Sequence, residues 1–338
     1  MINFVTEKGN VPFGFFKQPM GLINYQDFQL RDATRRILPS SAREERFVHF
    51  HFMGFTSNRF IAGCSLSKSS AQTAVFFYLF DRQKSELVLK KGCRIDEGNA
   101  ALTLNPDDGL SWLSGRGKEV SFDLSNDNLY RKLFILLDGS PLLELYIQER
   151  EMNTLRLCTP TGPSGWTYVQ KIAGAPASGK LIWQGVEIDL LEDGATAHYD
   201  FTAGFLRRET FWNWACITGI SETGDMVGLN LSNGVNETGI HENVVWLNGK
   251  MTTSPSVFFE YDLDDLSKPW RIQDQEGKTD LQFTPDGAYT AFHPDNPNPV
   301  DFTQAFGRFQ GQISAQNGKI LQINNLPGFT ERQYSVWW

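Results

Sequence analysis

Short apolar runs, rather than long amphipathic ones, dominate the pattern of hydrophobic and polar positions. Runs rich in Val, Ile, Phe, Tyr and Trp recur and are separated by clusters of Gly, Asn, Asp, Ser and Pro. This pattern is typical of antiparallel strands joined by tight turns. The clearest expected strands are residues 46–55, 59–66, 73–81, 86–90, 119–124, 131–137, 142–148 and 180–190.

Turn signals support this interpretation, and helical periodicity is scarce. Three dipeptides have the composition of two-residue hairpin turns, namely Asn248-Gly249, Asp286-Gly287 and Asn317-Gly318. Helical periodicity is limited to residues 25–38 and, briefly, 263–268. We therefore expect an all-β protein with little helix.

An internal similarity relates the two halves of the chain. Three runs of the first half recur in the second half in the same order, offset by nearly half of the 338 residues. A duplicated β unit explains this repetition, and coincidence between two β-rich halves is the alternative. The matching runs are residues 47–50, 63–67 and 77–81 in the first half and 211–214, 228–232 and 245–248 in the second.

The boundary between the two units is expected near the middle of the chain. Residues 159–165 and 174–179 are rich in Pro, Gly, Ser and Thr or Ala, and both lack strand alternation. We therefore expect a first domain of residues 1–165 and a second of residues 166–338. Each is long enough for about eight strands, which can close into a barrel or curled sheet around one small ligand.

Charge and composition restrict the classes of partner. The chain has a net charge of −8, and residues 169–338 carry 11 Lys and Arg against 21 Asp and Glu. This acidic half would repel phosphate backbones and anionic lipids, so we expect no nucleic-acid partner and no stable membrane insertion. Aromatic residues make up 13% of the chain, which suits an apolar pocket.

The expected location is the cytoplasm. The four cysteines are far apart, which favours reduced thiols over a disulfide framework. The first residues lack the pattern of a signal peptide. The longest apolar run, residues 74–80, is much shorter than the ~20 residues of a membrane-spanning helix.

Several short motifs resemble a known family. The resemblance is to the uncharacterised bacterial family called "domain of unknown function 2804"; it spans nearly the whole chain and is densest in residues 196–310. It implies no catalytic residues, because the family has none assigned. The motifs are Val11-Pro-Phe-Gly14, Tyr168-Val-Gln-Lys171, Asp200-Phe-Thr-Ala-Gly204, Thr210-Phe-Trp-Asn-Trp-Ala215, Gly228-Leu-Asn-Leu231, Glu242-Asn243, Asn248-Gly249, Pro269-Trp-Arg271, Leu281-Gln-Phe-Thr-Pro285 and Gly307-Arg308.

The doubled β layout is also similar, by architecture alone, to tandem lipocalin-like (calycin) proteins, which include carotenoid hydratases and some cyclases. This resemblance implies two lipocalin-like antiparallel barrels or curled sheets, and it is an analogy of fold rather than of function.

The densest group of candidate site residues lies in residues 205–216. If this segment is a strand, alternation puts Arg207, Glu209 and Asn213 on one face and Trp212 and Trp214 on the other. A carboxylate beside a guanidinium stays ionised and can accept a proton or hold a polar group. The alternative is that one face is barrel exterior and the tryptophans are ordinary core.

Two neighbouring segments contribute further candidates. Asp200 shares a strand face with His198, and together they could act as a general acid/base pair or form a surface pair. Glu242 and Asn243 end a polar loop that leads into the strand containing Trp246. A loop at a barrel mouth could grip the polar end of a ligand, and an ordinary solvated hairpin is equally compatible.

Two metal- or phosphate-like patterns carry little weight. His49 and His51 would share a strand face, but a metal site needs a third ligand and only three other histidines exist. Residues 174–180 resemble a phosphate-binding loop, but Leu181 follows instead of Ser or Thr, and the next run is strand-like. We therefore expect no metal and no cofactor.

Two functional hypotheses follow. In the first, an aromatic pocket binds an apolar small molecule and catalyses a hydratase, isomerase or cyclase reaction by proton transfer. Asp200 and Glu209 would be the acid/base residues, Arg207 would orient the ligand, and Trp212, Trp214 and Trp246 would flank a developing cation. In the second, the protein is a non-catalytic carrier of a lipid or isoprenoid. Whether it is an enzyme stays open at this point.

Overall fold

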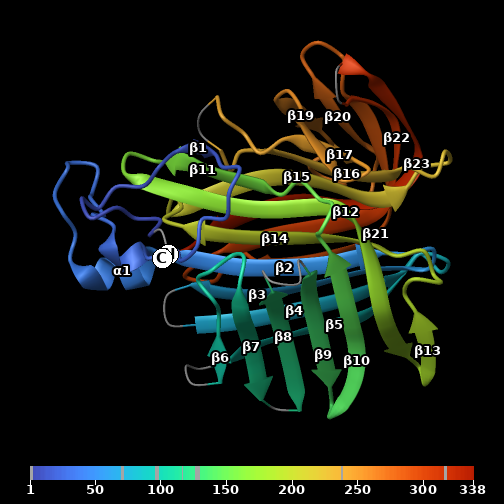
Figure 1. The fold of residues 1–338 in the computed structure, drawn as a ribbon, viewed down its shortest axis with the longest axis horizontal. Coiled ribbons are helices and arrows are strands. Elements are labelled where there is room, and N and C mark those ends of the chain that lie inside the picture. Colours follow the sequence, from blue (N-terminus) through green and yellow to red (C-terminus); the bar gives the residue numbers. More distant parts are fainter. Residues whose placement is uncertain are drawn as a thin grey trace.

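Two curled antiparallel sheets, one following the other along the chain, make up the molecule (Figure 1). The computed structural model describes residues 3–69, 72–95, 99–115, 117–125, 130–236, 239–315 and 318–338. The architecture is all-β, as expected from the short apolar runs, and it has the tandem lipocalin-like layout that the resemblance by architecture implied.

The first sheet has 14 strands. Its main path runs in the order β5-β4-β3-β2-β14-β12-β10-β9-β8-β7-β6, and β1, β11 and β13 pair at its sides. Its strands are β1 (Gly14–Phe15), β2 (Val48–Thr56), β3 (Phe60–Ser69), β4 (Gln72–Asp81), β5 (Glu86–Ile95), β6 (Ala100–Ala101), β7 (Gly109–Gly115), β8 (Lys118–Ser125), β9 (Tyr130–Leu137), β10 (Ser140–Gln148), β11 (Leu155–Thr161), β12 (Gly165–Trp183), β13 (Val186–Asp189) and β14 (Thr196–Gly204).

The second sheet has nine strands in the order β18-β17-β16-β15-β23-β22-β21-β20-β19. Its strands are β15 (Glu209–Ile220), β16 (Met226–Asn233), β17 (Val244–Leu247), β18 (Lys250–Thr253), β19 (Val257–Glu260), β20 (Trp270–Asp274), β21 (Asp280–His293), β22 (Val300–Ser314) and β23 (Ile320–Val336).

Both sheets follow the same plan. In each, four consecutive antiparallel strands (β2–β5 and β15–β18) run to one edge. The first of the four also pairs with the last strand of its own sheet, so β2 pairs with β14 and β15 pairs with β23. The three matching runs in the sequence fall on these strands, so the repeated pattern of residues corresponds to a repeated topology.

Most of the expected strands are present, and both helix predictions are wrong. Residues 25–38 contain only a 3₁₀ turn, η1 (Tyr25–Asp27), and the helix α1 (Ser40–Arg46) begins after them. The Asp32 carboxylate accepts hydrogen bonds from the backbone N–H groups of Thr34 and Arg36, which favours a turn over a helix. Residues 263–268 form turns. The expected strand 180–190 is instead the end of β12, a turn and β13.

The expected hairpin turns have mixed outcomes. Asn248-Gly249 joins β17 to β18 with φ angles of 49° and 80°, as a tight hairpin turn requires. The Asp286-Gly287 prediction is wrong, because the pair lies inside β21 at a bulge. Asn317 lies outside the described residues.

The chain passes from the first sheet to the second between Gly204 and Glu209. The expected border between residues 165 and 166 coincides with the start of β12, which belongs to the first sheet. Residues 174–179 are part of β12 rather than a linker. Division of the chain into domains 1–165 and 166–338 stays a prediction, and the sheets themselves divide at a later point.

Three apolar clusters hold the structure together. One fills the inside of the first sheet, one fills the second, and the third lies between the two sheets. The two sheets lie close together at Gly228, where a Cβ would lie 1.9 Å from the carbonyl oxygen of Ala173, so only glycine fits there. Among the described residues, no helix is long and apolar enough to cross a lipid bilayer.

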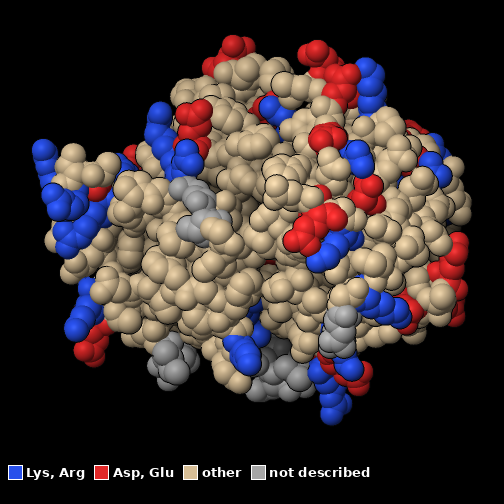
Figure 2. Space-filling view, turned by 90° about the horizontal axis from the view of Figure 1, so that it is seen from above, with Lys and Arg blue, Asp and Glu red and all other residues tan. Residues whose placement is uncertain are grey.

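Charged side chains of both signs are interspersed over the face seen in Figure 2, and basic ones gather at the edge that carries α1 in Figure 1.

Candidate functional site

A cavity of about 570 Å³ lies between the two sheets. Its walls come from β2, β3, β4, β12 and β14 of the first sheet and from β15, β16, β21, β22 and β23 of the second. The sequence analysis expected a ligand inside one barrel or curled sheet. This location is corrected, because the cavity lies between the two sheets. The insides of both sheets are filled by apolar clusters, whereas the facing outer surfaces enclose the cavity.

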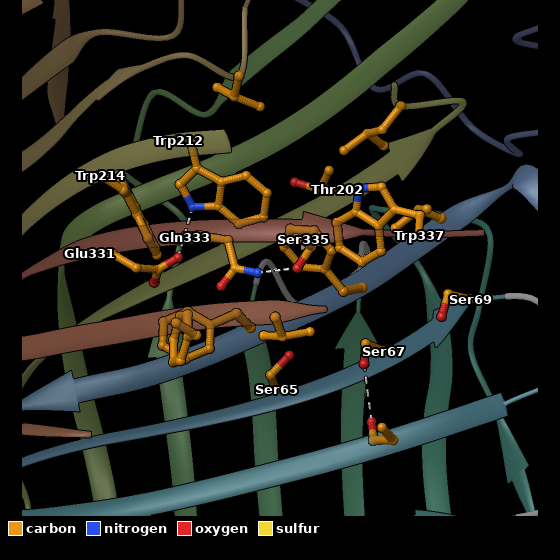
Figure 3. A pocket seen from close by; sticks show the side chains of 18 of the residues that line it. Ser65, Ser67, Ser69, Thr202, Trp212, Trp214, Glu331, Gln333, Ser335 and Trp337 are labelled. Carbon is orange, nitrogen blue, oxygen red and sulfur yellow. Dashed lines mark hydrogen bonds between the residues drawn. The ribbon is translucent and has the colours of Figure 1, made fainter. Parts of the chain in front are cut away.

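The cavity walls are largely apolar and rich in aromatic rings, with hydroxyl and amide groups along β3 and β23. Figure 3 shows Trp212, Trp214 and Trp337 with Gln333 and Ser335 of β23, and a row of serines on β3. The aromatic residues of the lining are Phe50, Phe52, Phe76, Trp212, Trp214, Tyr289, Phe302 and Trp337. The hydroxyl-bearing residues, apart from Tyr289, are Ser65, Ser67, Ser69, Thr202, Ser232 and Ser335.

A buried ion cluster forms part of the lining. Lys171 of β12 and Asp200 of β14 are direct cross-strand partners, so their side chains emerge side by side. The ammonium group of Lys171 lies 3.0 Å from Oδ2 of Asp200 and 2.9 Å from Oε1 of Glu242. Thr202 donates a hydrogen bond of 2.9 Å to the other oxygen of Asp200. All four residues are buried.

Burial and mutual attraction together shift the pKa values of the charged groups in this cluster. Burial alone would lower the pKa of Lys171, but attraction to Asp200 and Glu242 outweighs it and raises that pKa above its usual range. Burial raises the pKa of Asp200 above its usual 3.8, against the opposing effect of Lys171. Asp200 is thus a carboxyl group that holds a proton more readily than an exposed aspartate does.

A second buried carboxyl group, Glu331 of β23, lines the same cavity. Its Oε1 accepts a hydrogen bond of 2.8 Å from Nε1 of Trp212, and its Oε2 accepts one of 3.0 Å from Nε2 of Gln304 (Figure 3 shows the first). Burial raises the pKa of Glu331 from 4.5 to about 7, although both hydrogen bonds favour the charged form. Glu331 can therefore exist in either protonation state near neutral pH.

The family assignment comes from the sequence as a whole. A family model described as "Domain of unknown function (DUF2804)" matches residues 2–337. The chain belongs to the DUF2804 family. No curated protein sequence is significantly similar to it.

Solved structures relate this DUF2804 chain to others by fold. A crystal structure of CghA with Sch210972 has 10% sequence identity and a TM-score of 0.50, covering 96% of this chain and 98% of CghA. Kievitone hydratase from Nectria haematococca has 12% identity and a TM-score of 0.48, covering 85% and 89% of the two chains. A putative AttH from Nitrosomonas europaea has 12% identity and a TM-score of 0.45, covering 87% and 93%. At such identities the likeness to CghA shows a shared fold alone.

Four of the expected site residues of this DUF2804 chain meet at the cavity. Asp200, Trp212, Trp214 and Glu242 all line it. The two tryptophans that alternation places on one face of β15 both face the cavity. Trp214 also lies over Lys171, whose ammonium is 4.8 Å from the ring centre.

The other five expected residues lie outside the lining. Glu209 is exposed and accepts a hydrogen bond of 2.9 Å from the Tyr334 hydroxyl. Arg207 is also exposed and precedes β15, which begins only at Glu209. The expected polar row of Arg207, Glu209 and Asn213 is therefore not formed as one buried face.

The remaining three expected residues have structural contacts. The Asn213 side chain donates to Asn233, and Asn243 bonds the backbone of Ser232 and Pro255. Trp246 is fully buried between the sheets and donates a hydrogen bond of 2.6 Å to the backbone of Asn153. Their assignment as ligand-binding residues stays a prediction.

The histidine candidates are also buried in packed surroundings. The His198 ring lies between Phe52 and Phe329, and neither ring nitrogen has a hydrogen-bond partner among the described residues. The Nε2 atoms of His49 and His51 lie 3.0 Å apart inside the first sheet. In the part of the chain that is described, no three His, Cys, Asp or Glu side chains are grouped as metal ligands.

The sequence analysis missed two residues of the cavity, Lys171 and Glu331. Lys171 lies between Val169 and Ala173 in the alternation of β12, and Glu331 follows Phe329 on β23. A charged residue at an inward position of a strand is rarely placed there without a partner. That signal could have identified both residues.

Proposed function

We propose that this protein binds an apolar small molecule, lipid- or isoprenoid-like, in the cavity between its sheets and transforms it by acid/base chemistry without a cofactor. The observation that supports this most is the pair of buried carboxyl groups, Asp200 and Glu331, on the wall of one largely apolar cavity. Perturbed acids in an apolar cavity are characteristic of catalytic sites.

The two carboxyl groups suit complementary roles. Protonated Glu331 would donate its proton to one carbon of a carbon–carbon double bond, which leaves a cation on the neighbouring carbon. Asp200, kept ionised by Lys171, would then accept a proton. If that proton comes from an adjacent carbon, the double bond moves; if it comes from a water molecule that adds to the cation, the product is an alcohol. In both outcomes the site gives one proton from Glu331 and takes one proton on Asp200, so the number of protons is conserved.

The aromatic walls would assist this chemistry. Trp212 and Trp214 present ring faces that stabilise a nearby positive charge, and the surrounding apolar side chains exclude bulk water. In this proposal Glu331 takes the acid/base role that the sequence suggested for Glu209, and the cation of the site is Lys171, which keeps Asp200 ionised, rather than Arg207. The reason is that Glu209 and Arg207 are exposed and absent from the lining.

A non-catalytic carrier is the second candidate, and one observation favours it. Hydroxyl and amide groups also occur near the exposed end of the cavity, at Ser67, Ser69 and Asn298, where a carrier would hold a polar head group. A carrier does not need the buried carboxyl groups of Asp200 and Glu331, which is why we place it second. For both candidates, a cytoplasmic location stays a prediction.

The test begins with mass spectrometry of small molecules that copurify with the full chain, since an enclosed apolar cavity can retain its ligand. The identified ligand is then incubated with the protein, with Asp200→Asn and Glu331→Gln, and with the exposed-surface control Glu187→Gln. We expect conversion that falls at least about 100-fold in the first two variants, as for loss of a general acid or base. Binding without conversion would favour the carrier, and unchanged conversion in both variants would contradict the assigned roles.

A further inference from the structure

We propose that the polar end of the ligand donates hydrogen bonds at the deep end of the cavity, which is the part lined by Asp200, Glu242 and Glu331. We further propose that this polar end carries no negative charge. The cavity then accepts alcohols or amines of apolar skeletons and rejects carboxylates such as fatty acids. This inference rests on the proposed function and deepens it, because it names the chemical class of the ligand for an enzyme and for a carrier alike.

The first argument is the balance of charge at the deep end. Three carboxyl groups, of Asp200, Glu242 and Glu331, are buried there beside one cation, Lys171. That cation is already matched twice, by ion pairs of 3.0 Å and 2.9 Å to Asp200 and Glu242. The other cationic residue of the lining, Lys68, is exposed. A ligand carboxylate would therefore bring a further negative charge into an acidic, poorly solvated site.

The second argument is a hydrogen-bond acceptor without a donor. Oε2 of Glu242 is buried and has no hydrogen-bond partner among the described residues. Glu242 lines the cavity. A buried acceptor without a donor is unfavourable, so a ligand that supplies an O–H or N–H group gains affinity there. A carboxylate has no hydrogen to donate.

The third argument is the aromatic wall beside these groups. The Trp214 ring already lies over the ammonium of Lys171, at 4.8 Å. The Trp212 indole N–H is used by Glu331, so its ring presents a face rather than a donor. Ring faces attract positive charge and repel negative charge. The buried charges, the unpartnered acceptor and the ring faces thus all favour a neutral or positively charged group that donates hydrogen bonds.

The experiment compares three probes that share one isoprenoid skeleton: farnesol, farnesylamine and farnesoate. Each is titrated into the full chain at about pH 7.5, where the amine is protonated and the acid ionised. Binding is measured by quenching of tryptophan fluorescence, since three tryptophans line the cavity, and by calorimetry. We expect farnesol and farnesylamine to bind at least about tenfold more tightly than farnesoate.

Two variants test whether Glu242 causes the preference among the probes. Glu242→Gln removes one negative charge at almost constant shape, so the preference for farnesylamine over farnesoate is expected to fall about tenfold. Glu187→Gln, at an exposed glutamate of β13, should leave the preference unchanged. If Glu242→Gln does not fold, the probe series on the unaltered chain still decides the question.

The outcomes separate this inference from the proposed function. Binding of farnesoate as tight as that of farnesol would overturn the inference while leaving an apolar-ligand cavity intact. Failure of all three probes to bind would contradict the proposed function itself. A preference that survives Glu242→Gln in full would overturn the role given to this cluster.

Discussion

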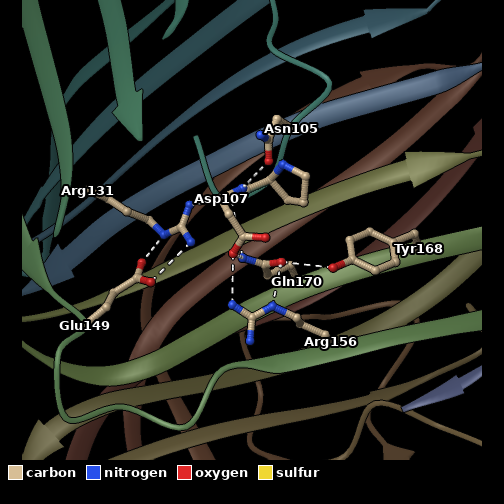
Figure 4. A network of polar contacts seen from close by, with 8 residues as sticks. Asn105, Asp107, Arg131, Glu149, Arg156, Tyr168 and Gln170 are labelled. Atoms are coloured by element: carbon tan, nitrogen blue, oxygen red, sulfur yellow. Dashed lines mark hydrogen bonds and ion pairs between the residues drawn. The ribbon is translucent and has the colours of Figure 1, made fainter. Parts of the chain in front are cut away.

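Two buried polar regions of the molecule differ in how their groups are satisfied. The first is the cluster of Lys171, Asp200, Glu242 and Glu331 at the cavity between the sheets. The second lies inside the first sheet, where Arg131 pairs with Glu149 and Arg156 lies 2.8 Å from Asp107 (Figure 4). Both regions bury several charges; the groups of the first line the cavity between the sheets, whereas those of the second bond one another and a backbone segment.

The second region ties one segment of chain to the sheet. Residues 105–107 receive hydrogen bonds from three strands: Arg131 of β9 and Gln170 of β12 both donate to the backbone oxygen of Pro106, and Arg156 of β11 pairs with Asp107. Figure 4 shows these side chains converging on that segment. The comparison teaches that a buried charge is a candidate functional group when it borders a cavity, and a structural tie when its partners are other fixed parts of the chain.

The largest expected effect is that of Lys171→Met. The substitution leaves Asp200 and Glu242 buried without their cation, and removing one partner of a buried ion pair costs about 3–5 kcal/mol. We expect this loss in the free energy of unfolding, measured with urea at neutral pH. The triple variant with Asp200→Asn and Glu242→Gln should recover most of it, because no unpaired charge then remains. A loss below about 1 kcal/mol in the single variant would show that the cluster is solvated rather than buried.

The sequence predicted the fold better than it predicted the site. Strand alternation, turn residues and the repeated runs were enough for a tandem all-β fold, because these are local properties of the chain. Trp212 and Trp214 were also identified, since alternation along one strand decides which side chains share a face. Lys171 and Glu331 were missed because the residues that they meet are far away in the sequence: β12 pairs with β14, β15 pairs with β23, and one sheet packs on the other. That packing depends on pairings between residues far apart, such as Lys171 with Glu242.

The second expected effect is a pH dependence of stability that Glu331 causes. Its pKa is raised from 4.5 to about 7, so between these values the folded chain retains a proton that the unfolded chain has lost. The free energy of unfolding therefore falls as the pH rises from 4.5 to 7, by up to about 3 kcal/mol. Glu331→Gln should remove this slope. Urea unfolding at several pH values checks it, and parallel pH profiles for the two proteins would contradict the assigned burial of the charge.

The smallest expected effect has the opposite sign and belongs to the inside of the first sheet. Burial lowers the pKa of His49 from 6.5 to about 3, so below pH 6.5 the unfolded chain binds a proton that the folded chain does not. Stability due to a neutral His49 is therefore present above pH 6.5 and is lost as the pH falls, by about 2 kcal/mol at pH 5. His49→Gln retains a donor near Nε2 of His51 and should reduce this acid sensitivity by that amount. Equal losses of stability in the variant and the unaltered chain between pH 7 and 5 would contradict a buried, neutral His49. The contrast between structural groups inside the first sheet and ionisable groups at the cavity would then lose its basis.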